Sequence, residues 1–256
     1  MYKLKLDFLK RILTDTVDKE VYNDFFNNGY PSEDKMIECI NAPIDEQRNE
    51  GLDWPENAHT MIGIKRLNNL HNMLDYVRDN NIDGDLIETG VWRGGATIFM
   101  KAYVEMHSLD KKVFVCDSFE GLPVPNTDKY PDDLGDTHYQ VDFLKVSLES
   151  VKNNFRIYNL LDEKVIFLKG WFSDTLKNND TIGNISILRF DGDMYGSTID
   201  VLDNLYEKVV DKGVIIIDDY CLPNCAKAVT DFKNQKNIKE DLNYVDKCGR
   251  FWFKKK

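Results

Sequence analysis

The sequence has 256 residues, of which 42% are hydrophobic and 30% are charged, a composition typical of a folded domain and not of a disordered chain. The net charge of −11 argues against a protein that coats nucleic acid, because phosphate binding needs a clustered cationic surface. No apolar run reaches the roughly 18 residues of a membrane span, and residues 1–11 lack the apolar core and cleavage site of a signal peptide. We therefore expect a cytoplasmic protein with no nucleic-acid or membrane partner.

The chain divides into two segments that differ in polarity and in the regularity of their apolar pattern. Residues 1–58 are polar, with short amphipathic patches interrupted by turn signals such as Gly29-Tyr30-Pro31-Ser32. They predict a helical N-terminal arm or lid and not an independent domain. From residue 59 to 256, helical patterns alternate with apolar runs, which predicts an α/β fold with a mostly parallel sheet.

Apolar positions at helical spacing predict the helices, and unbroken apolar runs predict strands buried on both faces. In chain order we predict a helix over 67–77, a strand over 85–88, a helix over 95–106, a strand over 113–116, a long loop over 123–145, a helix over 151–161, strands over 165–168 and 185–190, a helix over 199–209, a strand over 214–217, a helix over 223–236, and a terminal hairpin of 244–245 with 250–253. Carboxylates stand where four of these strands end: Glu88, Asp117, Asp191, and the pair Asp218-Asp219. Because the carboxyl ends of parallel strands share one edge, these side chains should meet at the ligand site.

The turn after the first strand, residues 88–95, contains glycines but lacks the GxGxxG spacing of a dinucleotide site. Gly90 permits a sharp turn, and Gly94-Gly95 let the next helix begin close to the sheet. At the end of the following strand, Asp117 can accept hydrogen bonds from ribose hydroxyls and Phe119 can offer a face to a purine. These features favour an adenosine ligand without a pyrophosphate. In the alternative, the glycines form a tight turn and Asp117 caps a helix.

Asp191-Gly192-Asp193 and Asp218-Asp219 end two neighbouring predicted strands. Carboxylates placed side by side repel one another, and a bound Mg²⁺ resolves that conflict. Manganese and calcium share the preference for oxygen ligands. Capping of the next helix is the alternative, and it explains only one of these residues.

His138 lies in the long loop, at the sheet edge where the site is expected. A histidine there can act as a general base near neutral pH. The alternative is a surface histidine.

The five cysteines, Cys39, Cys116, Cys221, Cys225 and Cys248, are odd in number and have neither redox nor zinc-site spacing. We expect reduced, mostly packed thiols.

Six segments in order resemble the macrocin O-methyltransferase, or TylF-like, family: TMIGIKRL (60–67), IETGVWRGGA (87–96), DSFEGLP (117–123), GWFSDTL (170–176), LRFDGDMYGST (188–198) and IIIDDYC (215–221). The resemblance extends over about residues 60–252. It implies a class I methyltransferase fold with a seven-stranded sheet, S-adenosylmethionine as cofactor, Mg²⁺, and methylation of a sugar hydroxyl. It further implies a helical arm that acts as a lid and as a contact in a homo-oligomer.

The resemblance also implies roles for individual residues. Asp191, Asp218 and Asp219 would bind the metal, vicinal hydroxyls of the substrate would chelate it, and His138 or Asp191 would accept the hydroxyl proton. Thr60 and Met61 would lie by the methionine end of the cofactor, and Ser147, Phe172, Ser173 and Asp174 by the adenine. The remaining cofactor residues would be Glu88, Thr89, Gly90, Val91, Trp92, Arg93, Asp117, Ser118, Phe119, Glu120 and Gly121.

The acceptor is the least constrained part of this prediction. Lysine is much more frequent than arginine and asparagine pairs recur, which indicates an AT-rich bacterial source and favours a nucleotide-linked or surface-polysaccharide sugar over a macrolide. Three alternatives remain open: methylation of an amine, phosphate-type oxygen or catechol; a non-catalytic cofactor-binding module; and a nicotinamide dehydrogenase, which the absent GxGxxG disfavours.

Overall fold

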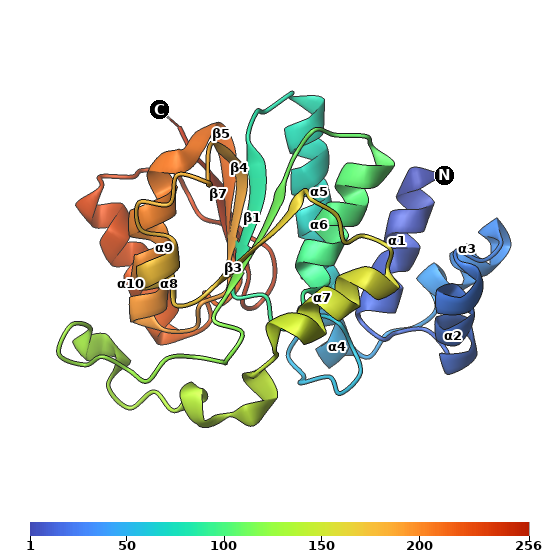
Figure 1. Cartoon of the computed structure of the whole chain (residues 1–256), viewed down its shortest axis with the longest axis horizontal. Coiled ribbons are helices and arrows are strands. Elements are labelled where there is room, and N and C mark those ends of the chain that lie inside the picture. Colours follow the sequence, from blue (N-terminus) through green and yellow to red (C-terminus); the bar gives the residue numbers. More distant parts are fainter. Residues whose placement is uncertain (256) are drawn as a thin grey trace.

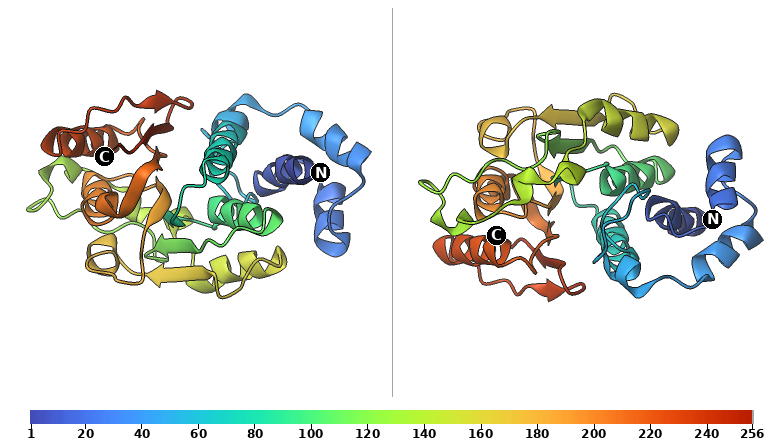
Figure 2. Two further views of the ribbon diagram at one scale, coloured as in Figure 1. Left: turned by 90° about the horizontal axis from the view of Figure 1, so that it is seen from above. Right: turned by 90° about the horizontal axis from the view of Figure 1, so that it is seen from below.

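One sheet of seven strands runs through the middle of the protein, with helices on both faces (Figures 1 and 2). The computed structural model describes residues 1–255. The strands are β1 (Asp85–Thr89), β2 (Val113–Asp117), β3 (Val165–Lys169), β4 (Ile185–Phe190), β5 (Val209–Ile217), β6 (Asn243–Tyr244) and β7 (Arg250–Phe253). Their order is β3-β2-β1-β4-β5-β7-β6, with β1 to β5 parallel and β7 antiparallel to both β5 and β6. The mostly parallel sheet with a C-terminal antiparallel hairpin, predicted from the sequence, is confirmed.

The helices form one layer on each face of the sheet, because each has one apolar side (Figure 2). They are α1 (Tyr2–Leu13), α2 (Lys19–Asn28), α3 (Glu33–Asn41), α4 (Glu46–Glu50), α5 (Ile64–Asp79), α6 (Gly95–Met106), α7 (Leu148–Ile157), α8 (Phe172–Thr175), α9 (Tyr195–Leu205) and α10 (Pro223–Gln235). Side chains of α1, α5, α6 and α7 share one buried cluster, and those of α9 and α10 belong to the other. Among the described residues, no helix combines the length and apolarity needed to cross a membrane.

The N-terminal segment begins with a helix that is part of the main core. On α1, Leu6, Phe8, Ile12 and Leu13 are fully buried, and they belong to the same cluster as the apolar faces of α5 and α6. The helices α2 and α3 lie outside α1, at the edge of the molecule farthest from the C-terminal strands (Figure 1). Truncation of residues 1–58 would therefore expose core surface, whatever further role α2 to α4 have.

Several helix boundaries differ from the predicted ones, and two of the differences have a clear local cause. The helix predicted over 151–161 begins at Leu148, because the Ser147 hydroxyl caps it by accepting the Ser150 N–H (3.2 Å). The helix predicted over 199–209 ends at Leu205, because a 3₁₀ turn (Tyr206–Lys208) leads directly into β5 at Val209.

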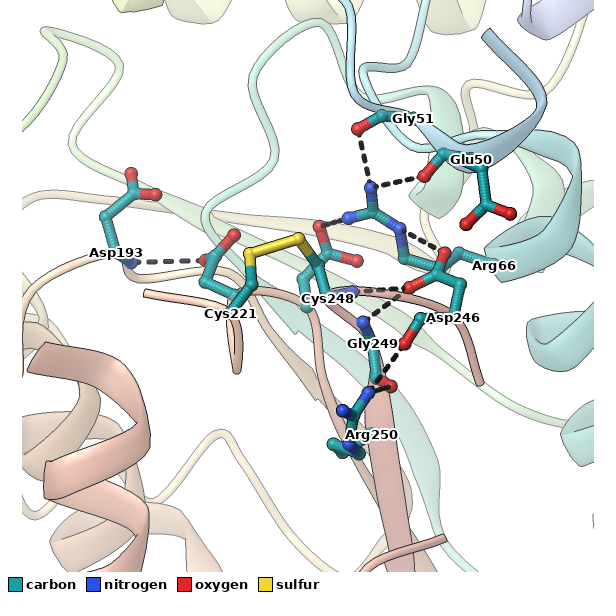
Figure 3. Close-up of a disulfide and its surroundings, with 11 residues drawn as sticks. Glu50, Gly51, Arg66, Asp193, Cys221, Asp246, Cys248, Gly249 and Arg250 are labelled. Carbon is teal, nitrogen blue, oxygen red and sulfur yellow. Dashed lines mark hydrogen bonds and ion pairs between the residues drawn. A yellow bond between two sulfur atoms is a disulfide. The ribbon is translucent and has the colours of Figure 1, made fainter. Parts of the chain in front are cut away.

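The expectation of reduced cysteines is wrong for one pair, since Cys221 and Cys248 form a disulfide (Figure 3). Their sequence separation of 27 residues hides the pairing. The turn after β5 and the turn before β7 meet because β5 and β7 are adjacent antiparallel strands. Cys39, Cys116 and Cys225 are free and buried, as expected.

The strand order reverses between β1 and β4. From β1 the chain adds β2 and β3 toward one edge of the sheet, and from β4 it adds β5 toward the other edge. In open α/β sheets the ligand site lies at this switch point, beyond the carboxyl ends of the strands. The 122–145 loop passes along that edge, beneath the sheet in Figure 1, and carries three 3₁₀ turns (Pro131–Asp133, His138–Gln140 and Asp142–Leu144).

Candidate active site

A cavity of about 600 Å³ opens at the carboxyl ends of β1, β2, β4 and β5. Its volume lies within the usual range for pockets that enclose a small ligand. Fifteen of the predicted site residues line it: Thr60, Met61, Glu88, Gly90, Val91, Trp92, Asp117, Ser118, Gly121, His138, Phe172, Ser173, Asp191, Asp218 and Asp219.

Six predicted cofactor residues are not in the cavity wall: Thr89, Arg93, Phe119, Glu120, Ser147 and Asp174. The Phe119 ring is buried against Phe167 (6.4 Å between centroids), so it offers no free face to a purine. Ser147 is occupied as the α7 cap, and the exposed Glu120 pairs with Lys169 (2.9 Å). The structure thus brings the predicted metal and methionine-end residues into one cavity and, of the predicted adenine residues, places only Phe172 and Ser173 in its wall.

The glycine turn after β1 is packed against β4. Gly90 has a φ of +79°, and a Cβ at this position would collide with the backbone carbonyl of Asp191. Only glycine therefore allows the turn to approach the carboxylate-bearing end of β4 so closely.

Asp117 supports the same turn from β2. Its two oxygens accept the N–H groups of Val91 (2.8 Å) and Phe119 (2.7 Å). Burial raises the pKa of Asp117, and these N–H groups oppose that rise. Asp117 therefore supports turns and caps no helix in the described part of the chain. Its Oδ1 also accepts the Ser118 hydroxyl (3.4 Å), so Oδ2 is the oxygen that retains a lone pair.

The arm and the 122–145 loop meet over the glycine turn. The Trp54 and Phe143 rings stack (5.5 Å between centroids), and the Trp92 indole N–H donates to the Phe143 carbonyl (3.0 Å). The Arg93 guanidinium lies over the Trp92 ring and donates to the carbonyls of Glu56 and Ala58. Arg93 therefore acts on the arm and not on the cavity.

Two buried arginines hold the carboxylates at the strand ends. Arg189, near the end of β4, pairs with Glu88, Asp218 (2.6 Å) and Asp191 (3.4 Å). Burial raises the pKa of Glu88 to about 7, although Arg189 opposes that rise, and the second Glu88 oxygen is buried without a hydrogen-bond partner.

Arg66, on α5, connects three parts of the chain (Figure 3). Its guanidinium donates to Asp218 (2.5 Å), to Asp246 (3.1 Å) and to the Gly51 carbonyl (2.8 Å). Sequence reasoning assigned no role to either arginine. The available signal was an arginine within the apolar run of β4, since a buried arginine is rare unless it is paired.

Asp218 is the one carboxylate of the β5 end that these arginines neutralise. Burial alone would raise its pKa, but Arg189 and Arg66 outweigh that effect and hold the pKa below its ordinary value. Each arginine contacts a different Asp218 oxygen, so both oxygens keep a further lone pair.

Three other carboxylates, Asp191, Asp193 and Asp219, form what we call the acidic trio. One oxygen from each lies within 4.8 Å of the others, and the Asp193 N–H donates to Asp219 (3.2 Å). Asp193 has a φ of +52°, an uncommon conformation for a non-glycine residue and one often found at functional sites. Sequence reasoning placed Asp193 beside the metal residues without assigning it a role.

The acidic trio has little compensating charge, since Arg189 reaches only Asp191 of the three, at 3.4 Å. Burial and mutual repulsion raise the pKa of Asp219 to about 7, that of Asp193 to about 8, and that of Asp191 well above its ordinary value. A hard divalent cation prefers such oxygen donors and would stabilise their ionised forms. The donor set therefore fits Mg²⁺.

His138 lines the cavity from the 122–145 loop and is partly exposed. Its Nδ1 lies 3.0 Å from Asp136, whose backbone-facing oxygen also accepts the His138 N–H (2.9 Å). The carboxylate orients the ring, which leaves Nε2 as the atom with which it can exchange a proton.

The seven-stranded sheet, mostly parallel with one antiparallel pair, is that of the class I methyltransferases. The solved structure of the O-methyltransferase NovP matches the whole of this chain and the whole of its own, with a TM-score of 0.86 at 42% identity. The family model of macrocin O-methyltransferase (TylF) matches residues 3–254, and the chain belongs to that family.

Curated relatives agree with this assignment. Demethyldecarbamoylnovobiocin O-methyltransferase of Streptomyces niveus is 48% identical over 81% of this chain and 80% of its own length. Mycinamicin III 3″-O-methyltransferase of Micromonospora griseorubida is 40% identical over 98% and 96%. This chain is therefore an O-methyltransferase, with S-adenosylmethionine as its methyl donor. The match from residue 3 includes α1 and the arm, which the sequence motifs did not reach.

Proposed function

We propose that the enzyme methylates a sugar hydroxyl with the help of Mg²⁺. The observation that carries this proposal is the acidic trio, three clustered carboxylates in the cavity wall, of which only Asp191 has a cationic neighbour among the described residues. The names of the relatives support the acceptor class: one names a rhamnosyl-tetracenomycin as the molecule that is methylated, and two others name demethyldecarbamoylnovobiocin and mycinamicin III.

Asp191, Asp218 and Asp219 are the proposed metal ligands. Asp191 and Asp219 belong to the acidic trio, and Asp218 is oriented by Arg66 and Arg189 while it keeps a lone pair on each oxygen. Such oriented ligands are typical of metal sites whose neighbours fix the geometry. When bound, Mg²⁺ would supply positive charge that favours ionisation of a nearby hydroxyl.

Three groups can accept the proton that the sugar hydroxyl loses. His138 and Asp191 were proposed from the sequence, and the geometry adds Asp193, which lies in the cavity wall beside Asp191 and Asp219. Comparing pH–rate profiles of His138→Gln and Asp193→Asn assigns the role. The variant that removes the base loses the acid limb of the profile, and the other one keeps it.

The cofactor would lie between the glycine turn and the β2 end. Thr60, Met61, Glu88 and Asp117 face that part of the cavity, with the orphaned Glu88 oxygen and the spare lone pair of the Asp117 Oδ2 as hydrogen-bond acceptors. Trp54 and Phe143 cover the turn from outside, which would exclude water from the methyl donor. We propose that the arm acts as this lid and as the contact of a homo-oligomer.

The charge of the cavity wall indicates whether the acceptor sugar is attached to a nucleotide diphosphate or to an uncharged group. Carboxylates outnumber cationic side chains there, and the cations are Arg66, Arg189 and Lys129. The two arginines are already paired, and Lys129 lies 3.3 Å from Asp200. A diphosphate would meet repulsion with little compensation. Of the two carriers predicted from the sequence, a surface polysaccharide or other uncharged glycoside is therefore favoured over a nucleotide-linked sugar.

The test is S-adenosylhomocysteine release with panels of neutral glycosides, oligosaccharides and nucleotide sugars, each with Mg²⁺ or EDTA. We expect release with a neutral sugar, dependent on Mg²⁺, and a product heavier by one methylene. Release that EDTA does not reduce would refute the metal proposal and leave methyl transfer intact. A product methylated on nitrogen would refute the sugar proposal.

A further inference from the structure

Three residues of the 122–145 loop, Lys129, Tyr130 and Asp133, attach it to helix α9. The other residues of the loop are exposed or half-buried, but Asp133 is only 1% exposed. Its Oδ1 accepts the Tyr195 N–H (2.7 Å) and its Oδ2 accepts the Gly196 N–H (2.8 Å). These are the first N–H groups of α9, whose own N-cap residue, Met194, has no side-chain hydrogen bond to them. A loop residue about 60 positions earlier in the chain thus performs the capping.

Tyr130 makes the second attachment, one turn further along α9. Its hydroxyl donates to Asp200 (2.7 Å), and the Lys129 ammonium lies over its ring and 3.3 Å from the same carboxylate. The ring packs on Gly196, where a Cβ would come within 2.5 Å of the Tyr130 Cδ2 and 3.0 Å of the Asp133 Oδ2. Glycine at position 196 therefore leaves the space that the loop occupies.

Helix α9 follows the acidic trio directly, since Asp191 and Asp193 lie between β4 and α9. The loop attached to α9 carries Val124, Asn126 and His138, which line the same cavity as those carboxylates. Asp136, which orients His138, donates its N–H to the Asp133 carbonyl (3.1 Å). The attachment of the loop to the N-terminal half of α9 therefore fixes where the cavity residues of the loop lie relative to the acidic trio.

We propose that Asp133 and Tyr130 are positioning residues that fix the acceptor wall of the cavity relative to the acidic trio, with Gly196 as their seat. We call these three residues the loop latch. The proposal rests on the proposed sugar methylation for what the wall recognises. The three latch residues line the cavity themselves, and they act on the acceptor wall through the placement of Asn126 and His138. The cofactor side of the cavity, built on β1 and β2, does not depend on the latch.

The first experiment compares Asp133→Ala with Asp128→Ala. Asp128 is an exposed residue of the same loop, so its replacement changes the charge equally and leaves the α9 attachment intact. For Asp133→Ala we expect kcat/KM for the acceptor to fall about 10- to 100-fold, mainly through a higher KM. The Kd of S-adenosylmethionine should stay within about twofold, because no cofactor contact changes. Equal losses in acceptor and cofactor binding would overturn the proposal, since they indicate general misfolding.

Limited trypsin digestion reports on the latch without any acceptor. Cleavage after Lys129 or Lys145 should become at least about fivefold faster in Asp133→Ala and stay at the wild-type rate in Asp128→Ala. If no sugar is methylated by the wild-type enzyme, the proposed function fails, and this digestion still decides whether the loop is held as described. Unchanged cleavage in Asp133→Ala would overturn the latch.

A double-mutant cycle tests Gly196 by different chemistry. Gly196→Ala adds one methyl group at a position where alanine is otherwise the better helix former, so a loosened loop cannot be attributed to helix propensity. We expect Gly196→Ala to loosen the loop as Asp133→Ala does, and to add little in a Tyr130→Ala background, where the obstructing ring is absent. Additive effects of the two substitutions would overturn the role of Gly196 as the seat of Tyr130.

Discussion

The two sides of the cavity place carboxylates at equivalent positions of the sheet and treat them differently. On the β1/β2 side, Asp117 is satisfied by two backbone N–H groups. On the β4/β5 side, Asp218 is satisfied by two guanidinium groups, while the trio of Asp191, Asp193 and Asp219 shares one distant contact, from Arg189 to Asp191 (3.4 Å). The difference separates the carboxylates whose charge is neutralised or hydrogen-bonded by the protein itself from those that need a cation from solution. The position of a carboxylate at a strand end predicts that it lies at the ligand site. The charges and donors around that carboxylate predict whether its role is structural or metal-binding.

The largest effect is expected for Asp218→Asn, because it acts on both fold and chemistry. The substitution removes the charge that two buried arginines share, and breaking a buried ion pair costs about 3–5 kcal/mol of unfolding free energy. Turnover should be abolished while cofactor binding stays largely intact. Denaturant unfolding and S-adenosylmethionine titration measure the two losses. Unchanged turnover would contradict a role for Asp218 at the metal.

Asp219→Asn separates chemistry from stability. It removes a carboxylate from the acidic trio, so turnover should fall by at least about 10³-fold through loss of metal-assisted ionisation. Its unfolding free energy in EDTA should be equal to or higher than that of the wild type, because repulsion is relieved. Comparison with Asp218→Asn is the control, and a stability loss of similar size in both variants would remove the distinction between compensated and uncompensated carboxylates.

The pH dependence of stability follows from the same contrast. The pKa of Asp219 is raised from 3.8 to about 7 in the folded protein, so between these values the folded state binds more protons than the unfolded state. The stabilising contribution of this protonated group is therefore lost as the pH rises from about 4 to about 7. In EDTA we expect wild-type stability to fall across this window by about 1–3 kcal/mol more than that of Asp219→Asn. Thermal unfolding at each pH, repeated with Mg²⁺, measures the difference, and Mg²⁺ should reduce it.

The smallest effect is expected on the β1/β2 side. Asp117→Asn keeps one hydrogen-bond acceptor for the turn and weakens the acceptor that remains for the ribose, so the Kd of S-adenosylmethionine should rise about tenfold. Mg²⁺ dependence should not change. Isothermal titration with and without Mg²⁺ checks both statements, and a changed metal requirement would show that the two sides are not independent.

Much of this arrangement was accessible from the sequence. Unbroken apolar runs located the strands, and the rule that parallel strands end at one edge brought Glu88, Asp117, Asp191 and Asp219 into one cavity. What escaped prediction was set by side chains that meet across the fold. Phe119 turned into the core because β3 supplies an apolar neighbour, Phe167. The pairing of Asp218 depended on Arg66, which is 152 residues away. The hydrophobic periodicity of one sequence does not show which residues far apart in the chain come into contact.

The Cys221–Cys248 bridge has a further consequence for how the chain comes apart. It closes a covalent ring over the intervening residues, which contain α10 and β6. A protease that cuts once within this ring, for instance after Lys236 or Lys239, leaves both fragments linked through sulfur. The cut enzyme would migrate as one species on a non-reducing gel and as two after reduction. Because β7 stays tethered beside β5, the edge of the sheet can remain assembled after its backbone has been severed.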